Sequence, residues 1–344
     1  MKGSDTVTRH LLRPRPYPSK LSLVIPMYNE EAVVGPLRAG IERFRSEVQC
    51  AIEVVLVNDG SSDATLNHLV EWASGDPLVR VLHLSRNFGH QIACTAGLDY
   101  AGGDAVVLMD ADLQDPLSAI HPMIARYREG YDVVYGERES RVGESVPKRL
   151  TAWAFYRIMR TLVDRRLPAD VGDFRLISRE CLDSLKEMRE THRFLRGMVA
   201  WVGYPQIAVK YHRGPRIAGS TKYPLRKMLA FAWTAATSFS TVPLRLSVFL
   251  GIAIGLFSIE EGVRAVLAYA LGWYTIPGWK SLMVVTTAIG SALLTSIGIV
   301  GEYVAKLYEQ SKGRPLYLVA RSFNVAPGEA SEAPGRASAA SQSR

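Results

Sequence analysis

Residues 106–115 read Val-Val-Leu-Met-Asp-Ala-Asp-Leu-Gln-Asp, an apolar run that ends in two carboxylates one residue apart. A short β-branched run of this kind, bounded by Gly102-Gly103 and Pro116, is typical of a buried strand in a parallel sheet. In open α/β sheets, ligands bind just beyond the carboxyl ends of such strands. The polar residues that follow this strand are therefore predicted to lie at a ligand-binding edge.

The first of these polar residues are suited to binding a metal ion. Asp110 and Asp112 alternate onto the same side of the chain, and Gln114 can turn in behind them. Hard oxygen ligands suit Mg²⁺ or Mn²⁺, which take one or two protein carboxylates and let substrate phosphates complete the shell. The alternative is a strand that ends in solvated acids, and an Asp-x-Asp pattern alone does not separate the two.

Strand and helix patterns alternate along the first part of the chain. Strands are predicted at 21–27, 52–57, 79–84, the Val106 stretch and 132–135, with helical patterns between them at 32–48, 90–100 and 117–129. This alternation predicts an α/β fold with a mostly parallel sheet covered on both faces. Neither Gly-x-Gly-x-x-Gly after the first strand nor a Walker motif occurs, so dinucleotide-binding and P-loop folds lack support.

Charge and cysteine usage narrow the class of protein. The formal net charge is +8, with acidic residues concentrated in the first half and a basic block between Arg138 and Lys227. Such a block suits a polyanion, whether nucleic acid, an anionic membrane or a phosphorylated substrate. Cys50, Cys94 and Cys181 have no metal-ligand spacing and indicate reduced thiols in the cytoplasm. The first residues lack the apolar core of a signal peptide, so none is predicted.

Membrane character is concentrated toward the C-terminus. Residues 281–301 contain no charge, and about 20 such residues match the hydrocarbon thickness of a bilayer. A second apolar stretch precedes it, and basic residues flank the pair on the outside more than in the turn between them. The positive-inside rule then predicts a two-helix hairpin, at 244–274 and 281–303, with both ends in the cytoplasm.

Charged residues interrupt the first of these two predicted helices. Glu260 and Arg264 are four residues apart on one helical face, and together with Glu261 they separate two apolar runs. The pair can partly neutralise itself. Intramembrane charges usually face a bundle interior or another subunit, so we expect a homo-oligomer.

Two further segments combine apolar bulk with basic residues at near-helical spacing. The first, at about 148–164, contains Trp153 together with Arg157 and Arg160, and the second covers 224–242. Helices of this kind can lie in a membrane interface. Ordinary surface helices packed on the sheet are the alternative, and the segments alone do not decide between them.

Several motifs, in the order in which they occur along the chain, resemble those of a known protein family. Val24-Ile25-Pro26-Met27-Tyr28-Asn29-Glu30, Val57-Asn58-Asp59-Gly60-Ser61-Ser62-Asp63 and Asp110-Ala111-Asp112-Leu113-Gln114-Asp115-Pro116 resemble the signatures of family 2 glycosyltransferases of the GT-A fold. Gly172-Asp173-Phe174-Arg175-Leu176, Gly219-Ser220-Thr221-Lys222-Tyr223 and Gly313-Arg314-Pro315-Leu316-Tyr317 narrow it further. The chain is similar to the polyprenyl-phosphate glycosyltransferases, which include GtrB-like glucosyltransferases and dolichol-phosphate mannose synthase.

The resemblance implies roles for residues around the sugar donor. The positions that hold the donor nucleoside in relatives correspond to Pro26, Tyr28, Glu30 and Asp59. Asp110 matches a residue near the ribose and diphosphate, and the metal ligands match Asp112 and Gln114. The basic segment that closes over the diphosphate matches Arg216 and Lys222.

On the acceptor side, the resemblance implies a phosphate-binding set of Arg138, Lys148, Arg149 and Arg175. Asp112, Asp173 and Arg138 are the predicted catalytic residues. Asp173 is either a base or orienting group, or a structural carboxylate that pairs with Arg175. The acceptor is a lipid phosphate that is already an anion, so it needs positioning more than deprotonation.

The resemblance also implies the reaction and its location. We expect inverting, metal-dependent transfer of a hexose from a nucleotide sugar to polyprenyl phosphate of the undecaprenyl or dolichyl type. UDP-glucose is the favoured donor, with GDP-mannose or another UDP-sugar as the alternative. Mg²⁺ or Mn²⁺ would act as a Lewis acid on the departing phosphate. The protein is predicted to be a multi-pass protein of the cytoplasmic (inner) membrane, with the catalytic domain and both termini in the cytoplasm.

The predicted layout follows from the motifs and the composition together. It comprises a flexible arm (1–19), a GT-A domain (20–223), a juxtamembrane amphipathic helix (224–242), the hairpin (244–274 and 281–303), a cytoplasmic segment (304–325) and a disordered tail (326–344).

Three other functions are weighed against this one. A processive polysaccharide synthase would carry Gln-x-x-Arg-Trp, which does not occur. A non-catalytic membrane scaffold or translocation partner that keeps the fold would not need Asp110, Asp112 and Gln114 together. Nucleic-acid binding is disfavoured, because the basic block is interleaved with apolar residues and contains no recognised module.

Overall fold

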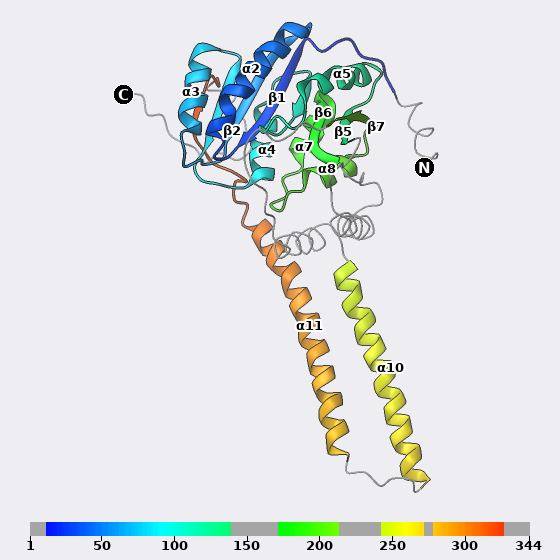
Figure 1. Cartoon of the computed structure of the whole chain (residues 1–344). Helices are drawn as coiled ribbons and strands as arrows, with labels where there is room; N and C mark the ends of the chain where they lie inside the picture. The colour runs from blue at the N-terminus through cyan, green and yellow to red at the C-terminus, as the bar shows by residue number, and fades with distance from the viewer. Residues whose placement is uncertain (1–11, 139–170, 213–241, 272–277, 327–344) are drawn as a thin grey trace. The chain divides into compact units, whose positions relative to one another are not determined.

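The computed structural model describes residues 12–138, 171–212, 242–271 and 278–326. The chain divides into two compact units, a sheet domain and a pair of long helices (Figure 1). The sheet domain includes the described residues that follow the second long helix, 314–326. Each unit is described by itself below.

The sheet domain is built on a mixed sheet with the strand order β7-β5-β6-β4-β1-β2-β3-β8. Its parallel part consists of β1 (Lys20–Met27), β2 (Ala51–Asn58), β3 (Val79–Leu84) and β4 (Ala105–Leu108). β5 (Val133–Arg138) is parallel to β7 (Gln206–Tyr211), whereas β6 (Val171–Ser178) is antiparallel to both β4 and β5. The predicted strands are confirmed within a few residues, and the sheet is mostly parallel as expected.

Alternation along each strand divides the core between the two faces of the sheet. Leu21, Leu23 and Ile25 of β1 point to one face, where they pack with residues of α2, α3 and α5. Val24 points to the other face and packs with residues of α4, α7 and α8. These helices are α2 (Glu31–Glu47), α3 (Thr65–Gly75), α4 (His90–Tyr100), α5 (Ile120–Arg128, after the 3-10 turn Leu117–Ala119), α7 (Arg179–Glu187) and α8 (Leu195–Val202). Both faces are therefore covered, as a buried sheet requires.

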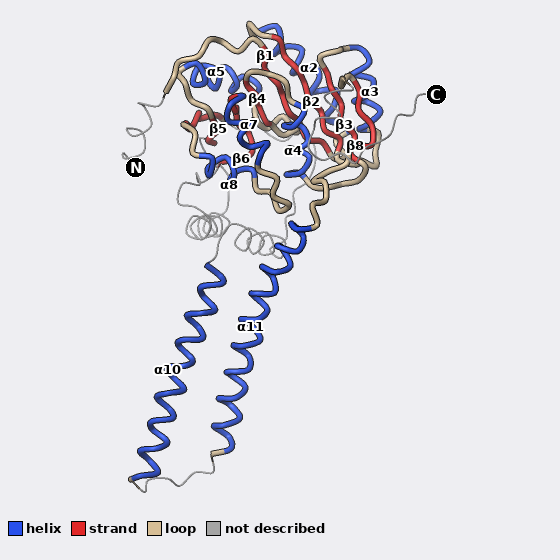
Figure 2. The backbone as a smooth tube through the Cα atoms, turned by 180° about the vertical axis from the view of Figure 1, so that it is seen from behind, coloured by secondary structure: helices blue, strands red, loops and turns tan. Residues whose placement is uncertain are grey.

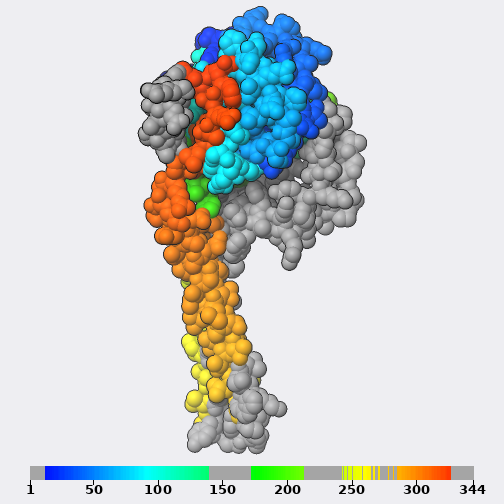
Figure 3. Space-filling model, turned by 90° about the vertical axis from the view of Figure 1, so that its left-hand side faces the viewer, coloured from blue at the N-terminus to red at the C-terminus, as the bar shows by residue number. Residues whose placement is uncertain are grey.

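The segment after the long helices returns to the sheet. β8 (Val319–Phe323) pairs antiparallel with β3 at the edge of the sheet, and Figure 2 shows the two strands side by side from behind. In Figure 3 the red-orange residues of this segment lie at the surface against cyan residues of the sheet domain. Tyr317 is buried and donates a hydrogen bond from Oη to Asp99 at 2.8 Å. Asn324 donates to three main-chain carbonyls between Ala73 and Val79. The sheet domain thus extends beyond the range 20–223 that the sequence predicts.

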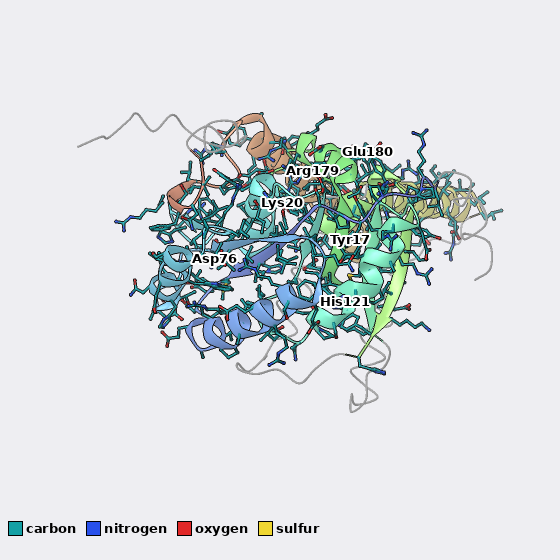
Figure 4. The ribbon with its side chains drawn as sticks, turned by 90° about the horizontal axis from the view of Figure 1, so that it is seen from above. Tyr17, Lys20, Asp76, His121, Arg179 and Glu180 are labelled. Carbon is teal, nitrogen blue, oxygen red and sulfur yellow. The ribbon has the colours of Figure 1, made fainter. Side chains whose placement is uncertain are left out.

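Part of the predicted flexible arm is packed on the domain. Arg15 forms an ion pair with Asp132, and its main-chain N–H donates to the carbonyl of Arg128. With Tyr17, Arg179 and Glu180, this segment lines a pocket of about 640 Å³ (Figure 4). Residues 12–19, predicted as part of a flexible arm, contact the domain through the half-buried Arg15 and Tyr17 and the buried Pro18. Residues 1–11 lie outside the described residues, and the flexibility of the arm stays a prediction.

The second unit contains α10 (Val242–Ala270) and α11 (Trp279–Ser311), which pack against each other. Many of their large apolar side chains are exposed, among them Phe249, Leu256, Leu267 and Leu294. Among the described residues, one helix is long and apolar enough to cross a membrane, at Val285–Ser311. On α10, Arg264 forms an ion pair with Glu261 at 2.9 Å. A hairpin that crosses the membrane twice stays a prediction.

Candidate active site

The topology gathers polar residues at one edge of the sheet. The carboxyl ends of β2 and β4 carry Asp59 and Asp110 to this edge, since the two strands are each parallel to β1. β6 runs the opposite way, so its beginning, with Asp173, lies at the edge where β4 ends. The same reasoning brings Arg138 and Tyr211, at the ends of β5 and β7, to this edge. These residues are far apart in sequence and meet because of strand direction.

A tight turn after β4 shapes the predicted metal ligands. Leu113 has a φ of 54°, an uncommon conformation for a non-glycine residue, and Gln114 donates its main-chain N–H to Asp112 Oδ1 at 3.1 Å. The side-chain Oε1 of Gln114 is buried without a hydrogen-bond partner in the described part of the chain. A buried acceptor left unpaired costs about 1–3 kcal/mol, so this oxygen is suited to a ligand that the protein itself does not supply.

These donors fit a hard divalent cation. Asp112 and Gln114 offer a carboxylate and an amide oxygen, which are the ligand types that Mg²⁺ and Mn²⁺ take. Among the described residues, no group of three His, Cys, Asp or Glu side chains converges on one point. A cation at this turn would therefore complete its shell with water and substrate oxygens, which is usual for Mg²⁺.

Asp59 fixes the loop after β3. Its Oδ1 accepts the main-chain N–H of Phe88 at 2.7 Å, and its Oδ2 accepts that of Gly89 at 2.9 Å. Gly60 follows with a φ of 66°, and a Cβ there would lie 2.5 Å from the main-chain carbon of Arg86. Only glycine allows this approach. Asp59 therefore positions the start of α4, and the structure gives it this role in addition to the predicted contact with a nucleoside.

The other predicted donor residues lie around the end of β1. Pro26 is buried in the strand, and Tyr28 is 48% exposed. Asn29, with a φ of 54°, accepts the N–H of Ser62 through Oδ1 at 2.8 Å. Glu30 donates its N–H to Thr65 Oγ1 at 2.9 Å. The two predicted nucleoside motifs are thus tied to each other by hydrogen bonds.

Asp173 is the centre of a buried polar network. Its carboxylate is 7% exposed and accepts hydrogen bonds from Arg196 Nε at 2.8 Å and His90 Nε2 at 3.1 Å. Although burial opposes ionisation, these donors hold the pKa of Asp173 far below its ordinary value. A carboxylate engaged in this way is a poor proton acceptor at neutral pH. The geometry therefore favours the structural alternative, with Arg196 rather than Arg175 as the closest partner.

Arg175 is buried beside this network. It donates to the main-chain oxygens of Asp173 at 3.2 Å and Gly172 at 3.0 Å, and it lies 4.0 Å from the Asp173 carboxylate. Burial lowers the pKa of Arg175 to about 10, which leaves it charged at neutral pH. Its donors shape the loop, so a contact with an acceptor phosphate stays a prediction.

At the edge of the sheet that holds the candidate site, the neighbours of Asp110 include three carboxylates, those of Asp112, Asp115 and Asp173. Burial and the neighbouring carboxylates raise the pKa of Asp110, and the ring of His90 works against them. His90 Nε2 lies 3.7 Å from Asp110 Oδ1. Burial would lower the pKa of His90, but its neighbours Cys94, Asp173 and Asp110 raise the pKa well above 6.5. The ring is thus a cation at neutral pH.

Arg138 and Tyr211 lie on the other side of the turn after β4. Tyr211 donates from Oη to Asp115, which is buried, and also hydrogen-bonds with Arg138. Burial raises the pKa of Tyr211 to about 12, so the phenol stays protonated. Arg138 also approaches Gly172, where a Cβ would lie 3.1 Å from its Nη2. Arg138 therefore reaches the same edge as the predicted metal turn.

The structure brings together only part of the predicted site. Pro26, Tyr28, Glu30, Asp59, Asp110, Asp112, Gln114, Arg138, Asp173 and Arg175 lie at or near one edge of the sheet. Four predicted residues lie outside the described residues: Lys148, Arg149, Arg216 and Lys222. The predicted interface helix at 148–164 and most of the helix at 224–242 also lie outside them.

Sequence reasoning missed three members of the network, His90, Gln91 and Arg196. Gln91 accepts the N–H of Leu195 through Oε1 at 3.0 Å, and its amide nitrogen lies 3.4 Å from Asp173. His90 could have been predicted as a site residue. It begins the helix that follows β3, so its side chain lies near the carboxyl end of that strand. Arg196 had no comparable local signal.

Comparison with known proteins shows the family to which the chain is similar. Residues 22–186 match the family described as Glycosyl transferase family 2. The chain is 42% identical to a Bacillus subtilis (strain 168) protein named "Uncharacterized glycosyltransferase YkcC", over 88% of this chain and 94% of the relative. It is 36% identical to the "Bactoprenol glucosyl transferase" of Shigella phage SfII, over 90% of this chain and all of the relative (100%). A solved structure of the mannosyltransferase PcManGT from Pyrobaculum calidifontis, in complex with GDP-Man and Mn²⁺, aligns with a TM-score of 0.38 at 15% identity, over 83% of this chain and 89% of that one.

Proposed function

Because the chain belongs to glycosyltransferase family 2, we propose that it transfers a hexose from a nucleotide sugar to a polyprenyl phosphate. The observation that carries this proposal is the edge of the sheet where Asp112 and the unpaired Oε1 of Gln114 lie beside Asp110. The name of the phage relative, a bactoprenol glucosyl transferase, supports a lipid phosphate as the acceptor and glucose as the sugar. UDP-glucose is therefore the donor we propose, with GDP-mannose or another UDP-sugar as the alternative.

We propose that Asp112 and Gln114 hold Mg²⁺ or Mn²⁺. When bound, such an ion supplies Lewis-acid stabilisation of the charge that builds up on the departing diphosphate. The chain's own contribution is to orient the two oxygens through the turn at Leu113. Asp110, at the end of the same strand, would accept hydrogen bonds from the ribose of the donor. Arg216 and Lys222 would add positive charge over the diphosphate.

On the acceptor side, the proposal assigns phosphate binding to Arg138, with Lys148 and Arg149. An arginine fork matches the geometry of a phosphate. The bond between the anomeric carbon and the diphosphate oxygen breaks while an oxygen of the lipid phosphate forms the new bond from the opposite side, so the anomeric configuration inverts. The lipid phosphate is already ionised, and no base is needed to activate it. Asp173 then serves to hold His90 and Arg196 in place.

The proposed reaction requires a membrane, and we propose that the long helices anchor the protein in it. A prenyl chain stays in the bilayer, so an enzyme that uses it must work at the membrane surface. α11 is apolar enough to cross, over Val285–Ser311. We propose that α10 crosses with it, with the sheet domain on the cytoplasmic side.

The test is to incubate the purified full-length chain with labelled UDP-glucose, GDP-mannose and UDP-galactose, each with undecaprenyl phosphate and Mg²⁺. The proposal expects label from UDP-glucose to enter a lipid that is extracted into organic solvent. Label that enters lipid from none of these donors would contradict transfer to a lipid phosphate and would favour the scaffold alternative.

A further inference from the structure

His90 is the first residue of α4, and its side chain is 45% exposed at the edge that holds the candidate site. The ring nitrogen Nε2 lies 3.1 Å from Asp173 Oδ2 and 3.7 Å from Asp110 Oδ1. The first distance is a hydrogen bond and the second is an ion-pair contact. One ring therefore lies between two carboxylates that come from different strands.

The position of this ring is fixed by the backbone that precedes it. Asp59 accepts the N–H groups of Phe88 and Gly89, and Gly89 turns the chain into the helix with a φ of 95°. One turn further along α4, Cys94 Sγ lies 3.5 Å from Nε2. The ring is thus held toward the two carboxylates by residues on both sides of it.

The two carboxylates differ in how much they depend on His90. Asp173 has a second close cation, because Arg196 donates to it at 2.8 Å and 3.2 Å. Within the part of the chain that the structure describes, the only ion-pair partner of Asp110 is His90. Removing the cation at His90 would leave Asp173 paired and Asp110 surrounded by other carboxylates.

We propose that His90 is a positioning residue for the donor: its ring orients Asp110 and offsets the negative charge of Asp110 next to the bound nucleoside diphosphate. This inference rests on the proposed function, in which Asp110 contacts the ribose of the donor. An uncompensated carboxylate at that point would repel the donor diphosphate, and it would also be free to rotate. His90 acts through Asp110 and does not itself touch the sugar.

The asymmetry between the two carboxylates gives the proposal a distinctive signature. Loss of this partly exposed ion-pair contact is expected to weaken donor use by about two- to fivefold. Acceptor use should change little, because Arg196 still holds Asp173. A general loss of structure would weaken both substrates alike.

The experiment compares His90→Gln, His90→Lys and His121→Gln in the full-length chain. His121 is a matched control, since its side chain is 38% exposed on α5, where Figure 4 labels it, and lies 3.2 Å from the carboxylate of Glu47, the last residue of α2. Initial rates are measured with UDP-glucose, undecaprenyl phosphate and Mg²⁺, and KM is determined for each substrate. Binding of UDP-glucose is measured separately by calorimetry.

We expect His90→Gln to raise the KM and Kd for UDP-glucose by about two- to fivefold, with the KM for undecaprenyl phosphate unchanged. His90→Lys restores a cation, so it should recover at least half of the loss in affinity for UDP-glucose on a logarithmic scale. The KM and Kd of His121→Gln for UDP-glucose should equal those of the unchanged chain. Equal donor constants for His90→Gln and the unchanged chain, or no recovery with His90→Lys, would overturn the inference. If His90→Gln does not fold, His90→Asn is measured in its place and is judged by the same two outcomes. If the unchanged chain binds UDP-glucose but transfers no sugar to the lipid, the proposed function fails, and the calorimetric comparison still decides the role of His90.

Discussion

Replacing Asp173 by asparagine tests whether this carboxylate holds the site together or acts as a base. The side chain is 7% exposed and accepts hydrogen bonds from Arg196 and His90. Asparagine has almost the same shape, but it is neutral and turns an NH₂ group toward one of these donors. The substitution therefore breaks a buried ion pair and leaves Arg196 and Arg175 without their counter-charge.

The structure allows the size of this effect to be estimated. Breaking a buried ion pair by removing one partner costs about 3–5 kcal/mol. For a domain of this size, about 2–4 °C of Tm corresponds to each kcal/mol, so Asp173→Asn should lower Tm by about 6–20 °C at pH 7. The pKa of Asp173 is lowered in the folded state, so its stabilisation is present above its ordinary value of 3.8 and is lost as the pH falls toward the folded value. The difference in Tm should therefore narrow when the pH falls below about 4.

The assay is thermal unfolding of the purified full-length chain in detergent, at pH 7 and at about pH 2.5. Asp183→Asn is the control, because Asp183 is 58% exposed and pairs with Arg179 on the same helix at 3.3 Å. An exposed pair contributes about 0–1 kcal/mol, so this variant should shift Tm by at most a few degrees. An Asp173→Asn variant with the Tm of the unchanged chain but without turnover would refute the reasoning, since it would show a carboxylate needed for chemistry and dispensable for stability.

Three further predictions concern the metal turn, the C-terminal segment and the long helices. Gln114→Ala removes the unpaired Oε1 and should weaken Mn²⁺ binding by at least about tenfold in calorimetry, with no fall in the Tm of the metal-free chain because a buried acceptor without a partner is lost; equal Mn²⁺ affinity would exclude Gln114 as a ligand. Tyr317→Phe removes the donor to Asp99 and should cost about 1 kcal/mol, seen as a fall of about 2–4 °C in Tm, whereas an unchanged Tm would show that the bond contributes nothing. Replacing Val242–Ser311 by a short flexible linker, with β8 retained, should leave UDP-glucose binding intact and lower turnover on undecaprenyl phosphate by about 100-fold, and undiminished turnover on that lipid would refute the anchoring role.

The replacement of Val242–Ser311 retains β8 because β8 belongs to the sheet, which the sequence alone did not reveal. Residues 304–325 read as a segment that follows the membrane helices, yet Tyr317 is buried and β8 completes the edge of the sheet. Nothing local in Val319–Phe323 identifies β3 as its partner. A deletion from residue 244 to the end would therefore remove part of the sheet domain as well as the long helices.

The parallel strands were predictable because their signal is local. β1, β2 and β4 are short apolar runs that end in polar turns, and each was located within one or two residues. β6 was not predicted, since Asp173 and Arg175 interrupt its apolar pattern. Arg196 and His90 approach the buried Asp173 carboxylate from other elements, and Arg175 is held by the main-chain oxygens of Gly172 and Asp173.

The same distinction applies to the candidate site. Asp110, Asp112 and Gln114 follow one strand, and their spacing indicated the chemistry directly. His90 and Asp173 are 83 residues apart, and their contact depends on β6 running antiparallel to β4. A pairing of that kind follows from the strand order, which the sequence pattern does not contain.

The most direct test of the account is sugar transfer by the Asp112→Asn variant, with labelled UDP-glucose and undecaprenyl phosphate, measured with and without Mg²⁺. The account predicts that the unchanged chain forms labelled lipid, that thorough removal of divalent ions abolishes this product, and that Asp112→Asn forms almost none while it keeps its Tm. Glycolipid formed at the full rate by Asp112→Asn, or by the unchanged chain without divalent ions, would contradict it.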